Sequence, residues 1–524
     1  MEITSMDDVL NSGWQPDLGD GHYQNPVLYA DYSDPDIVCV GDNIYMVASS
    51  FNHIPGLPVL HSTDLVNWKI INHVVQRINY PAYDNMQPGK GIWAPSIRYH
   101  NGLFWVFYSM PDEGIFMSYT ADPAKDWSEP HCIKAVKGWI DPCPFWDDDG
   151  RAWLVHAFAY SRSGIKHQLQ LCEMAPDATS LLDEGSIIFD GAVSHPTIEG
   201  PKMYWRNGWY YIFAPAGGVE SGWQTVLRSR QINGPFEARD VLHQGTSKVN
   251  GPHQGGWVEL KNGECWFMHF QDAAHNGRIV HLQPMRWKHD DWPEIGEKVD
   301  DAGPGQPVSV YPKPMTGKEG KSCKPQTTDR FADGRFGLQW QWQANPQRDW
   351  IIPSPEGLKL VCRPFGARSL YDTPQLLLQK LSAPQFTVTT RLTPHFNHDG
   401  EQSGLIVYGE RYGAVSVCRQ EGGWALVFDF GWMSDKGVLS QKRTVLSTLI
   451  RNEAVFIRAE ILQRGVCHFS FRQIETEEWK TVEPQLAISA GKWVGAKIGI
   501  YSAASGLDSD AGYSEFSYFE VKRH

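Results

Sequence analysis

Three acidic residues that lie far apart in the chain have similar local sequences. Asp34 lies in YSDPD, Asp141 in GWIDPCPF and Glu199 in IEGP, so each stands beside a proline or a glycine-proline turn. The apolar neighbours of Asp141 predict burial, whereas the aspartates at 147–149 run into a glycine and are typical of a solvated turn. A buried carboxylate must be paired, hydrogen-bonded or shifted in pKa, because losing its hydration costs several kcal/mol. These residues are therefore candidates for functional groups.

Three carboxylates around one pocket could perform acid–base chemistry on a glycosidic bond. One carboxylic acid would protonate the leaving oxygen, and a second, ionised carboxylate would activate water or attack directly. Both groups start with a pKa of about 4, so their surroundings must separate the two values. A third carboxylate beside the acid raises the pKa of that acid by repulsion between like charges. Asp141 is a candidate for this third role, although a single Asp-Pro is more often only a turn.

A repeat in the first 300 residues would bring the three carboxylates together. Five segments each begin with a proline-containing turn, form a short apolar strand, turn at a glycine and end in an aromatic-rich strand. They cover 33–49, 93–109, 140–157, 198–214 and 251–270. Most of the turns are Asn-Gly or Asp-Gly, the strongest short hairpin signal. A strand repeat of about 50 residues is typical of a β-propeller blade, so we expect a five-bladed propeller over residues 1–311.

The innermost strands of a propeller line its channel, and their equivalent ends face one opening. The leading positions of the five repeats are Asp34, Trp93, Asp141, Glu199 and His253. We therefore expect these five side chains around one mouth. Three carboxylates at the same phase of one repeat favour a functional site over three unrelated turns.

The motifs YSDPD, WAPS, WIDP, IEGP and HQG, in this order, resemble those of the family 43 glycoside hydrolases. The resemblance covers essentially the whole chain. It implies an inverting, exo-acting β-xylosidase or α-L-arabinofuranosidase on a five-bladed propeller. Transferred position by position, it makes Asp34 the general base and Glu199 the general acid. It makes Asp141 the residue that modulates the pKa of Glu199 and orients it.

The same resemblance assigns further residues. Arg278 matches an arginine that contacts the sugar and the carboxylates. His253 matches a channel histidine that in many relatives lies beside a water-coordinated calcium, so a structural calcium near His253 is expected as an option and no cofactor as a requirement. Trp93, Phe51 and Trp223 are candidates for substrate binding, because the apolar face of a sugar stacks well on an aromatic ring. With 22 tryptophans in the chain, most must belong to the core.

Two departures from the family pattern leave the exact pentose open. Ser33 precedes the base where many xylosidases carry proline or alanine, and Asn52-His53-Ile54 stands where Glu-Trp-Phe is common. A dedicated α-L-arabinofuranosidase is therefore one alternative. A retaining fructosidase, a phosphorolytic propeller enzyme and a non-catalytic glycan-binding propeller are others, but a non-catalytic propeller would usually have lost one of the three carboxylates.

The composition of the chain narrows the range of possible binding partners. The chain has 47 basic and 60 acidic side chains, a formal net charge of −13, which disfavours nucleic acid and anionic membranes and fits a neutral oligosaccharide substrate. Nine scattered cysteines without a CxxC pair argue against a disulfide framework or a thiolate metal site. The start, MEITSMDDVLNSGW, lacks the regions of a secretory signal, so we expect a cytoplasmic protein. Assembly into a homo-oligomer stays open.

The repeat stops near residue 328, after a basic stretch rich in Pro and Gly at 312–327 that is typical of a linker. Alternating, half-buried strands follow at hairpin spacing and predict two packed antiparallel sheets over 328–524. These strands are expected at 357–363, 386–393, 403–409, 424–432, 454–462, 467–473, 496–503 and 513–523. The resemblance implies a concanavalin-like β-sandwich with a loop that closes one side of the pocket. A stand-alone sugar-binding module is the competing interpretation.

Overall fold

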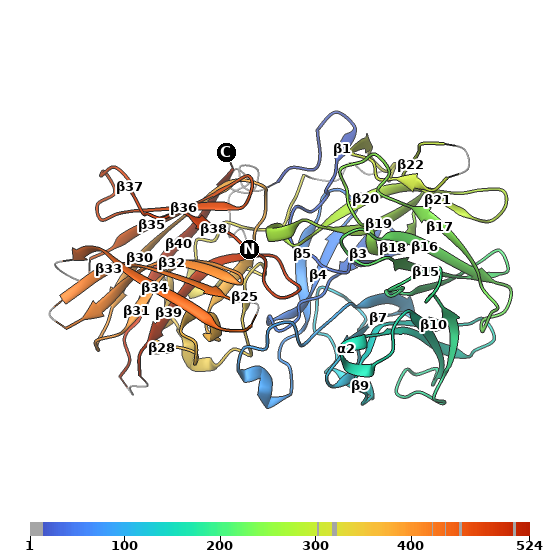
Figure 1. Cartoon of the computed structure of the whole chain (residues 1–524), viewed down its shortest axis with the longest axis horizontal. Helices are drawn as coiled ribbons and strands as arrows, with labels where there is room; N and C mark the ends of the chain where they lie inside the picture. Colours follow the sequence, from blue (N-terminus) through green and yellow to red (C-terminus); the bar gives the residue numbers. More distant parts are fainter. Residues whose placement is uncertain are drawn as a thin grey trace.

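The computed structural model describes residues 14–523 apart from gaps at 301–302, 317–321, 422, 435, 450–452 and 507–509. The N-terminal segment behind the localisation prediction and part of the predicted linker at 312–327 lie outside the described residues, so both stay predictions. Two all-β bodies lie side by side in Figure 1: the blades, coloured blue to yellow, and a sandwich, coloured orange to red. Among the described residues, no helix is both long and apolar enough for a membrane span.

Five blades, each built on four antiparallel strands, form the first body, which confirms the five-bladed propeller. Each blade runs from an innermost to an outermost strand in sequence order. The blades are I, β2 (Asp36–Val40), β3 (Asn43–Val47), β4 (Gly56–Ser62) and β5 (Lys69–Val75); II, β6 (Ser96–His100), β7 (Leu103–Met110), β8 (Gly114–Thr120) and β9 (His131–Lys134); III, β10 (Trp139–Trp146), β11 (Ala152–Phe158), β12 (Gln168–Met174) and β13 (Ser186–Asp190); IV, β14 (Lys202–Arg206), β15 (Trp209–Ala216), β16 (Trp223–Ser229) and β17 (Glu237–Leu242); V, β18 (His253–Glu259), β19 (Cys265–Asp272), β20 (Arg278–Trp287) and β21 (Pro293–Ile295). Blade IV is extended by β23 (Gly305–Gln306) and β22 (Glu297–Lys298).

Both ends of the propeller segment help to close the ring. Innermost strand β2 contacts β6 on one side and β18 on the other. The N-terminal strand β1 (His22–Gln24) pairs with β24 (Val310–Pro312), which follows blade V. Leu28 and Val280 also exchange backbone hydrogen bonds of 3.2 and 3.0 Å. The segment before blade I, which carries Asp34, is thereby fixed to blade V.

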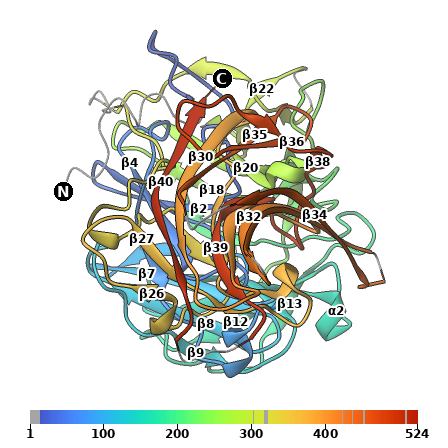
Figure 2. The same cartoon turned by 90° about the vertical axis from the view of Figure 1, so that its left-hand side faces the viewer.

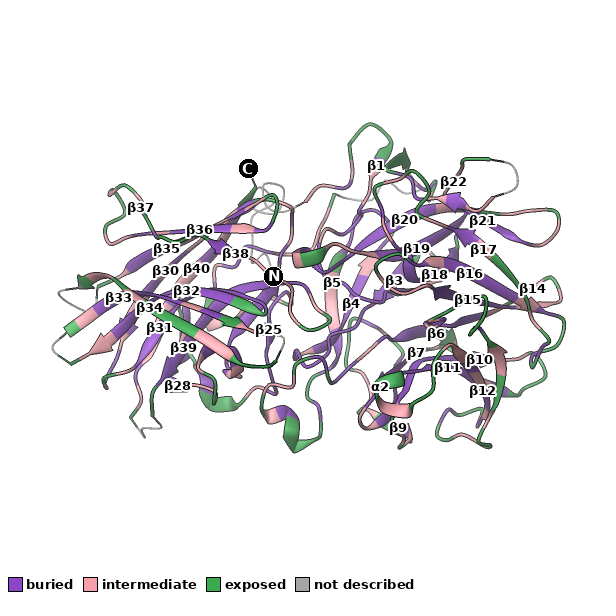
Figure 3. Ribbon diagram, viewed as in Figure 1, coloured by how far each residue is buried: buried purple, intermediate pink, exposed green. Residues whose placement is uncertain are grey.

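Apolar side chains pack between neighbouring blades rather than on the channel axis. One buried cluster lies at each of the five blade interfaces. The cluster between blades I and II joins Val47 and Val59 to Ile97 and Val106, for example. Figure 3 shows the blade strands mostly buried and many of the connecting turns exposed. The centre of the ring is left for polar side chains.

Two eight-stranded sheets form the second body, which confirms the predicted sandwich. Strand β30 alternates buried and half-buried residues along its whole length, as a sheet with one face in a core requires. The first sheet contains β25 (Gln341–Trp342), β28 (Arg363–Pro364), β29 (Leu377–Lys380), β31 (Gln402–Tyr408), β32 (Arg411–Gln420), β33 (Gly423–Met433), β34 (Leu439–Leu449) and β39 (Lys497–Ala504). The second contains β26 (Ile351–Ile352), β27 (Leu358–Val361), β30 (Phe386–His395), β35 (Val455–Leu462), β36 (Val466–Arg472), β37 (Lys480–Thr481), β38 (Leu486–Ala487) and β40 (Tyr513–Arg523). Figure 2 looks onto these sheets with the blades behind them.

Helical structure is limited to short turns in the described residues. They are η1 (Pro81–Asp84), α2 (Tyr160–Ser163), η2 (Ala274–Asn276), η3 (Ala332–Gly334), η4 (Arg348–Trp350) and η5 (Leu370–Asp372). The turn η2 leads directly into β20 and so positions its first residue, Arg278.

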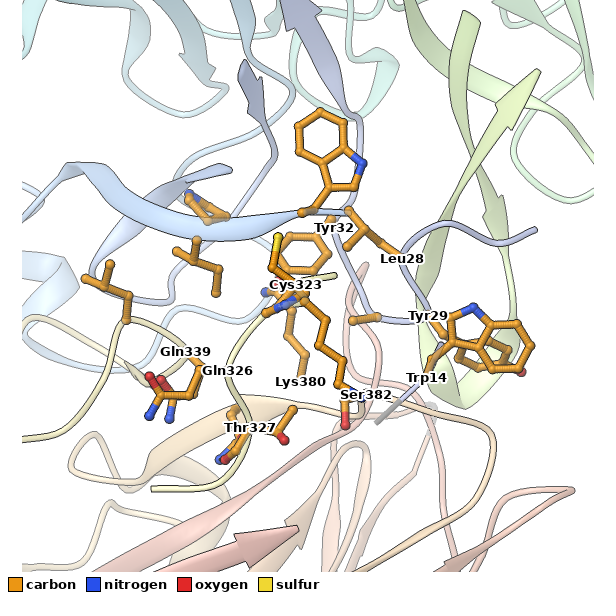
Figure 4. Close-up of a pocket in the computed structure, with 18 of the residues that line it drawn as sticks. Trp14, Leu28, Tyr29, Tyr32, Cys323, Gln326, Thr327, Gln339, Lys380 and Ser382 are labelled. Carbon is orange, nitrogen blue, oxygen red and sulfur yellow. The ribbon is translucent and has the colours of Figure 1, made fainter. Parts of the chain in front are cut away.

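Backbone hydrogen bonds hold the two bodies together. Ile54 in blade I and Trp342 in the sandwich exchange N–H···O bonds of 3.0 and 2.6 Å. The Asn345 side chain accepts a hydrogen bond from the N–H of Ile78 and donates one to its carbonyl, each 2.9 Å long. A pocket runs along this interface between Tyr32 and Lys380 (Figure 4). The sandwich is thus docked on blade I and on the segment that follows it by main-chain and side-chain hydrogen bonds.

Candidate active site

One pocket at the propeller mouth gathers six of the eight residues predicted from the sequence. It is lined by Asp34, Phe51, Trp93, Asp141, Glu199 and Arg278, together with Ala94, Ile140, Val219, Gln254 and Trp493. A seventh predicted residue, His253, contacts Glu199 from the channel below. Residues from every blade and from the sandwich loop before β39 therefore meet at this site.

Unusual backbone geometry aims two of the three acidic side chains into the pocket. Asp34 and Asp141 have positive φ angles of 54° and 57°, a region that non-glycine residues rarely occupy. Strand pairing in blade III also shifts register between Ile140 and Cys143, on either side of Asp141. A β-bulge of this kind turns a side chain away from its regular direction. Backbone strain at the site thus serves the placement of carboxylates.

Asp34 is buried and held by three donors. Ser33 Oγ and Ser49 Oγ donate to its Oδ2 over 2.7 and 2.6 Å. Arg278 Nη1 lies 3.1 Å from Oδ1 and also donates to Ser33 Oγ over 2.8 Å. This geometry leaves the carboxylate in one orientation at the pocket wall, as a general base needs. Ser33 stood out in the sequence only as a departure from the family pattern, and nothing there pointed to Ser49.

Asp141 is 2% exposed, which confirms the burial predicted from its neighbours. Burial and the nearby Glu199 and Asp34 carboxylates raise the pKa of Asp141 to about 8. Its Oδ2 accepts hydrogen bonds from the Gly200 N–H at 2.8 Å and from Gln254 Nε2 at 3.3 Å. Burial, together with repulsion among the three carboxylates, therefore keeps a proton on this group near neutral pH, and Asp141 also holds the backbone next to Glu199.

Glu199 faces the pocket with its side chain 22% exposed, from the turn before β14. Its Oε1 lies 2.8 Å from Nε2 of His253, which is fully buried at the start of β18. A partly exposed carboxyl can reach a substrate oxygen, and the fixed imidazole limits the directions it can take. The contact between His253 and Glu199 goes beyond the role that the sequence suggested for this histidine.

The residues around His253 can be tested for their fit to the predicted calcium ion. In the described part of the chain, no group of three or more His, Cys, Asp or Glu side chains is arranged to bind a metal ion directly. Two buried atoms of residues that are adjacent in the chain, His253 Nδ1 and Gln254 Oε1, lack a hydrogen-bond partner in the protein. An imidazole nitrogen and an amide oxygen fit an ion reached through its water ligands. The residues present therefore fit a hydrated calcium, which stays a prediction.

Aromatic rings form the walls of the pocket. Trp93 packs against Phe51 with ring centroids 6.0 Å apart, and against Trp493 at 6.4 Å. Trp493 is 44% exposed and comes from the sandwich. The sequence predicted a pocket-closing sandwich loop but not its residue, because Trp493 in AGKWVG looks like many other loop tryptophans.

Trp223 is the predicted substrate contact that the structure does not bring to the pocket. Its ring stacks on His243 with centroids 5.4 Å apart, and its Nε1 donates to Asp240 Oδ1 over 2.9 Å. The indole packs against Gly217, where a Cβ atom would lie only 2.5 Å from the ring. The expected role of Trp223 as a sugar platform is therefore corrected: this tryptophan stabilises blade IV.

The fold and the carboxylate group define a class, a propeller glycoside hydrolase with a second all-β domain. Profile comparison assigns the family. The profile of glycosyl hydrolases family 43 matches residues 23–293, and that of the beta-xylosidase C-terminal concanavalin A-like domain matches 328–522. The chain belongs to glycosyl hydrolases family 43 and is an inverting, exo-acting enzyme.

Individual relatives agree with this assignment. A putative beta-xylosidase of Xylanibacter ruminicola is 39% identical over 94% of this chain and 88% of its own length. A non-reducing end alpha-L-arabinofuranosidase of Bacteroides ovatus is 27% identical over 74% of this chain and 73% of its own. The crystal structure of a xylan beta-1,4-xylosidase from Bacillus halodurans C-125 shares the fold, with a TM-score of 0.83, 24% identity and coverage of 95% and 100%.

Proposed function

We propose that this enzyme releases terminal β-D-xylose from short xylo- or arabinoxylo-oligosaccharides and also accepts terminal α-L-arabinofuranose. The observation that carries the proposal is the convergence of Asp34, Asp141 and Glu199 in one pocket whose side is closed by Trp493. A pocket closed on one side suits removal of a single terminal sugar. The choice of xylose is supported by the Xylanibacter ruminicola relative, which is 39% identical and is named a putative beta-xylosidase.

The residues support a single-displacement mechanism. Glu199 transfers its proton to the glycosidic oxygen while the bond from that oxygen to the anomeric carbon breaks. Asp34 takes a proton from a water molecule, whose oxygen bonds to the anomeric carbon from the opposite face. Asp141 resists a second negative charge beside it, so the Asp141–Glu199 pair keeps one proton, and the Asp141 contact with Gly200 holds the backbone next to Glu199. Arg278 holds Asp34 in place through Nη1.

Two aryl substrates test the proposed sugar. We expect faster hydrolysis of p-nitrophenyl β-D-xyloside than of the α-L-arabinofuranoside, with α-xylose as the first product by NMR because the anomeric centre inverts. β-Xylose as the first product would contradict the assignment of Asp34 as a base. A reversed preference would identify a dedicated α-L-arabinofuranosidase, the activity named for the Bacteroides ovatus relative.

We also propose a water-coordinated calcium beside His253 and Gln254. The unpartnered His253 Nδ1 and Gln254 Oε1 support it. Removal of the ion with a chelator should lower the melting temperature, and added calcium should restore it. A melting temperature unchanged by either treatment would argue against the ion.

A further inference from the structure

Asp31 is a buried carboxylate, 3% exposed, that takes no part in the proposed mechanism. It precedes the base by three positions, in YADYSDPD. Its two oxygens accept hydrogen bonds from different domains. Oδ1 accepts the backbone N–H of Arg278 in blade V, and Oδ2 accepts that of Gly495 in the sandwich, each over 2.9 Å. One side chain thus bridges the catalytic arginine and the second domain.

The charge of Asp31 is balanced from the sandwich side. Nζ of Lys497, on β39, lies 3.9 Å from Asp31 Oδ2, and this lysine is itself 3% exposed. Burial lowers the pKa of Lys497, and the Asp31 carboxylate opposes that change. Burial, and then the charge of Lys497, also lower the pKa of Lys380 to about 7. Lys380 lies over the Tyr32 ring (Figure 4), with Nζ 5.2 Å from its centroid. Asp31 therefore compensates a buried positive group of the sandwich.

Two glycines let the domains approach at this point without intervening side chains. A Cβ atom on Gly277 would lie 2.6 Å from Asp31 Cγ and 2.6 Å from the Gly495 nitrogen. A Cβ atom on Gly495 would lie 2.7 Å from the carbonyl carbon of Asn276. The Ala496 N–H also donates to the His275 carbonyl over 2.8 Å. The turn before Arg278 and the sandwich loop before β39 are thereby fixed against each other.

Both fixed segments carry residues of the pocket. Arg278 follows Gly277 and bonds Asp34 through Nη1, and Trp493 precedes Gly495 by two positions and lines the pocket. We propose that Asp31 is a positioning residue that sets the places of Arg278 and Trp493 together, so that docking of the sandwich is part of the geometry of catalysis. The inference rests on the proposed function only for the reaction on which its effect is measured.

The variant Asp31→Asn tests the inference with little change of shape. An amide oxygen can still accept one of the two N–H groups, but its NH₂ group then faces the other. We expect kcat/KM on the faster aryl pentoside to fall on the order of 10²-fold, the loss typical of a misplacement near 1 Å. In an Arg278→Ala background the same change should cost much less, because Asp31 acts through that arginine. If the two substitutions lowered kcat/KM independently, so that their fold losses multiplied in the double variant, the inference would be wrong.

Asp329→Asn is the matched control. Asp329 is fully buried in the sandwich and accepts hydrogen bonds from the Phe331 N–H and from Trp340 Nε1, each over 2.9 Å. This variant should lower the melting temperature while leaving kcat/KM per folded enzyme unchanged. If Asp31→Asn behaved in the same way, Asp31 would be a residue of stability alone and the inference would be wrong.

Hydrogen exchange gives a readout without substrate. In Asp31→Asn, the amides of Arg278 and Gly495 should exchange faster, whereas those of β30 in the sandwich core should not. Unchanged exchange at both amides would overturn the inference. Since exchange needs no turnover, it decides the matter even if the wild-type enzyme were inactive on both aryl pentosides, the result that would sink the proposed function.

Gly495→Ala approaches the same contact from the other domain, in case Asp31→Asn folds poorly. Its methyl group would push the loop away from Asn276 without any change of charge. We expect a similar loss of kcat/KM and faster exchange at Arg278. Wild-type kinetics in this variant would show that the close approach of the two domains is not needed, and would overturn the inference.

Discussion

The two ends of the propeller are the mouth, which carries the pocket, and the far end opposite to it. They are built from the same strands but differ in how well the residue types suit the backbone conformation. At the far end, hairpins turn at Asn101-Gly102 and Asn207-Gly208 with positive φ at both residues, as type I′ turns require. At the mouth, Asp34 and Asp141 take positive φ with buried side chains. Local sequence and structure agree at the far end and conflict at the mouth. Such conflict is expected where backbone strain and buried charge serve a function.

Asp34→Ala should produce the largest effect at the mouth. Without the base no side chain activates the water, so kcat/KM should fall by at least about 10³-fold, toward the upper part of the range for general base catalysis. The loss should appear on activated and natural substrates alike. Kinetics on p-nitrophenyl β-D-xyloside and xylobiose check this, and a variant that kept more than a few per cent of activity would not have lost its base.

Glu199→Ala should separate substrates by their leaving groups. Xylobiose should lose about 10²–10⁴-fold in kcat/KM, since its leaving oxygen needs the proton of a general acid. An aryl xyloside with a very acidic phenol should lose far less, because a phenolate leaves without protonation. Equal losses on the two substrates would remove Glu199 from the role of acid.

Asp141→Asn should lower activity and raise stability at the same time. The folded-state pKa of about 8 lies above the unfolded value of about 4, so the unfolded chain binds fewer protons between these pH values. Burial of this carboxyl therefore weakens folding as pH rises from 4 to 8. An amide escapes that cost, and the melting temperature should rise at pH 7–8, by roughly 2–4 °C per kcal/mol recovered, with little gain near pH 4.

The pH dependence of activity gives a second prediction for Asp141→Asn. Replacing one carboxyl of the Asp141–Glu199 pair removes the repulsion that retains the shared proton. The alkaline limb of the kcat/KM profile should thus move to lower pH, with a loss of roughly 10²-fold at neutral pH and partial recovery on acidification. A loss uniform across pH would mean that Asp141 orients Glu199 through Gly200 without tuning it.

Trp493→Ala should raise KM by about tenfold with a smaller change in kcat, since one aromatic contact contributes about 1–1.5 kcal/mol. Trp205→Ala offers a control from the far end, where this side chain is 42% exposed. The control should keep wild-type kinetics. Similar KM values for the two variants would show that the sandwich loop does not contact substrate.

Gly102→Ala should give the smallest kinetic effect. Unlike Asp141→Asn, it should lower stability and leave activity unchanged. Gly102 has a φ of 78° and open space around its Cβ position, so the cost is backbone strain of about 1–2 kcal/mol. Denaturant unfolding should show this loss with kcat/KM unchanged. A change in kcat/KM would mean that the two ends of the propeller are coupled.

Features that repeat along the chain were predictable from sequence. The hairpin turns recur five times, so the blades and the convergence of Asp34, Asp141 and Glu199 could be predicted, and the sandwich strands expected from alternating residues are present. Strand β34 was not predicted, because its sequence LSQKRTVLSTL has little apolar alternation. The roles of Asp31, Ser33 and Trp493 depend on contacts between blades or domains, which no local pattern reports. Trp223 was misplaced because packing decides which of many tryptophans meet a pocket.

The hairpins at the far end also suit the attachment of other molecules. Tight, solvent-exposed turns are where chains best tolerate inserted segments. Asn207-Gly208 lies at the end of blade IV opposite Glu199, one strand length from the pocket. A surface tether or an added protein module spliced into this turn would hold the enzyme with its substrate entrance facing the solution, and immobilised preparations could then keep the kinetics of the free enzyme.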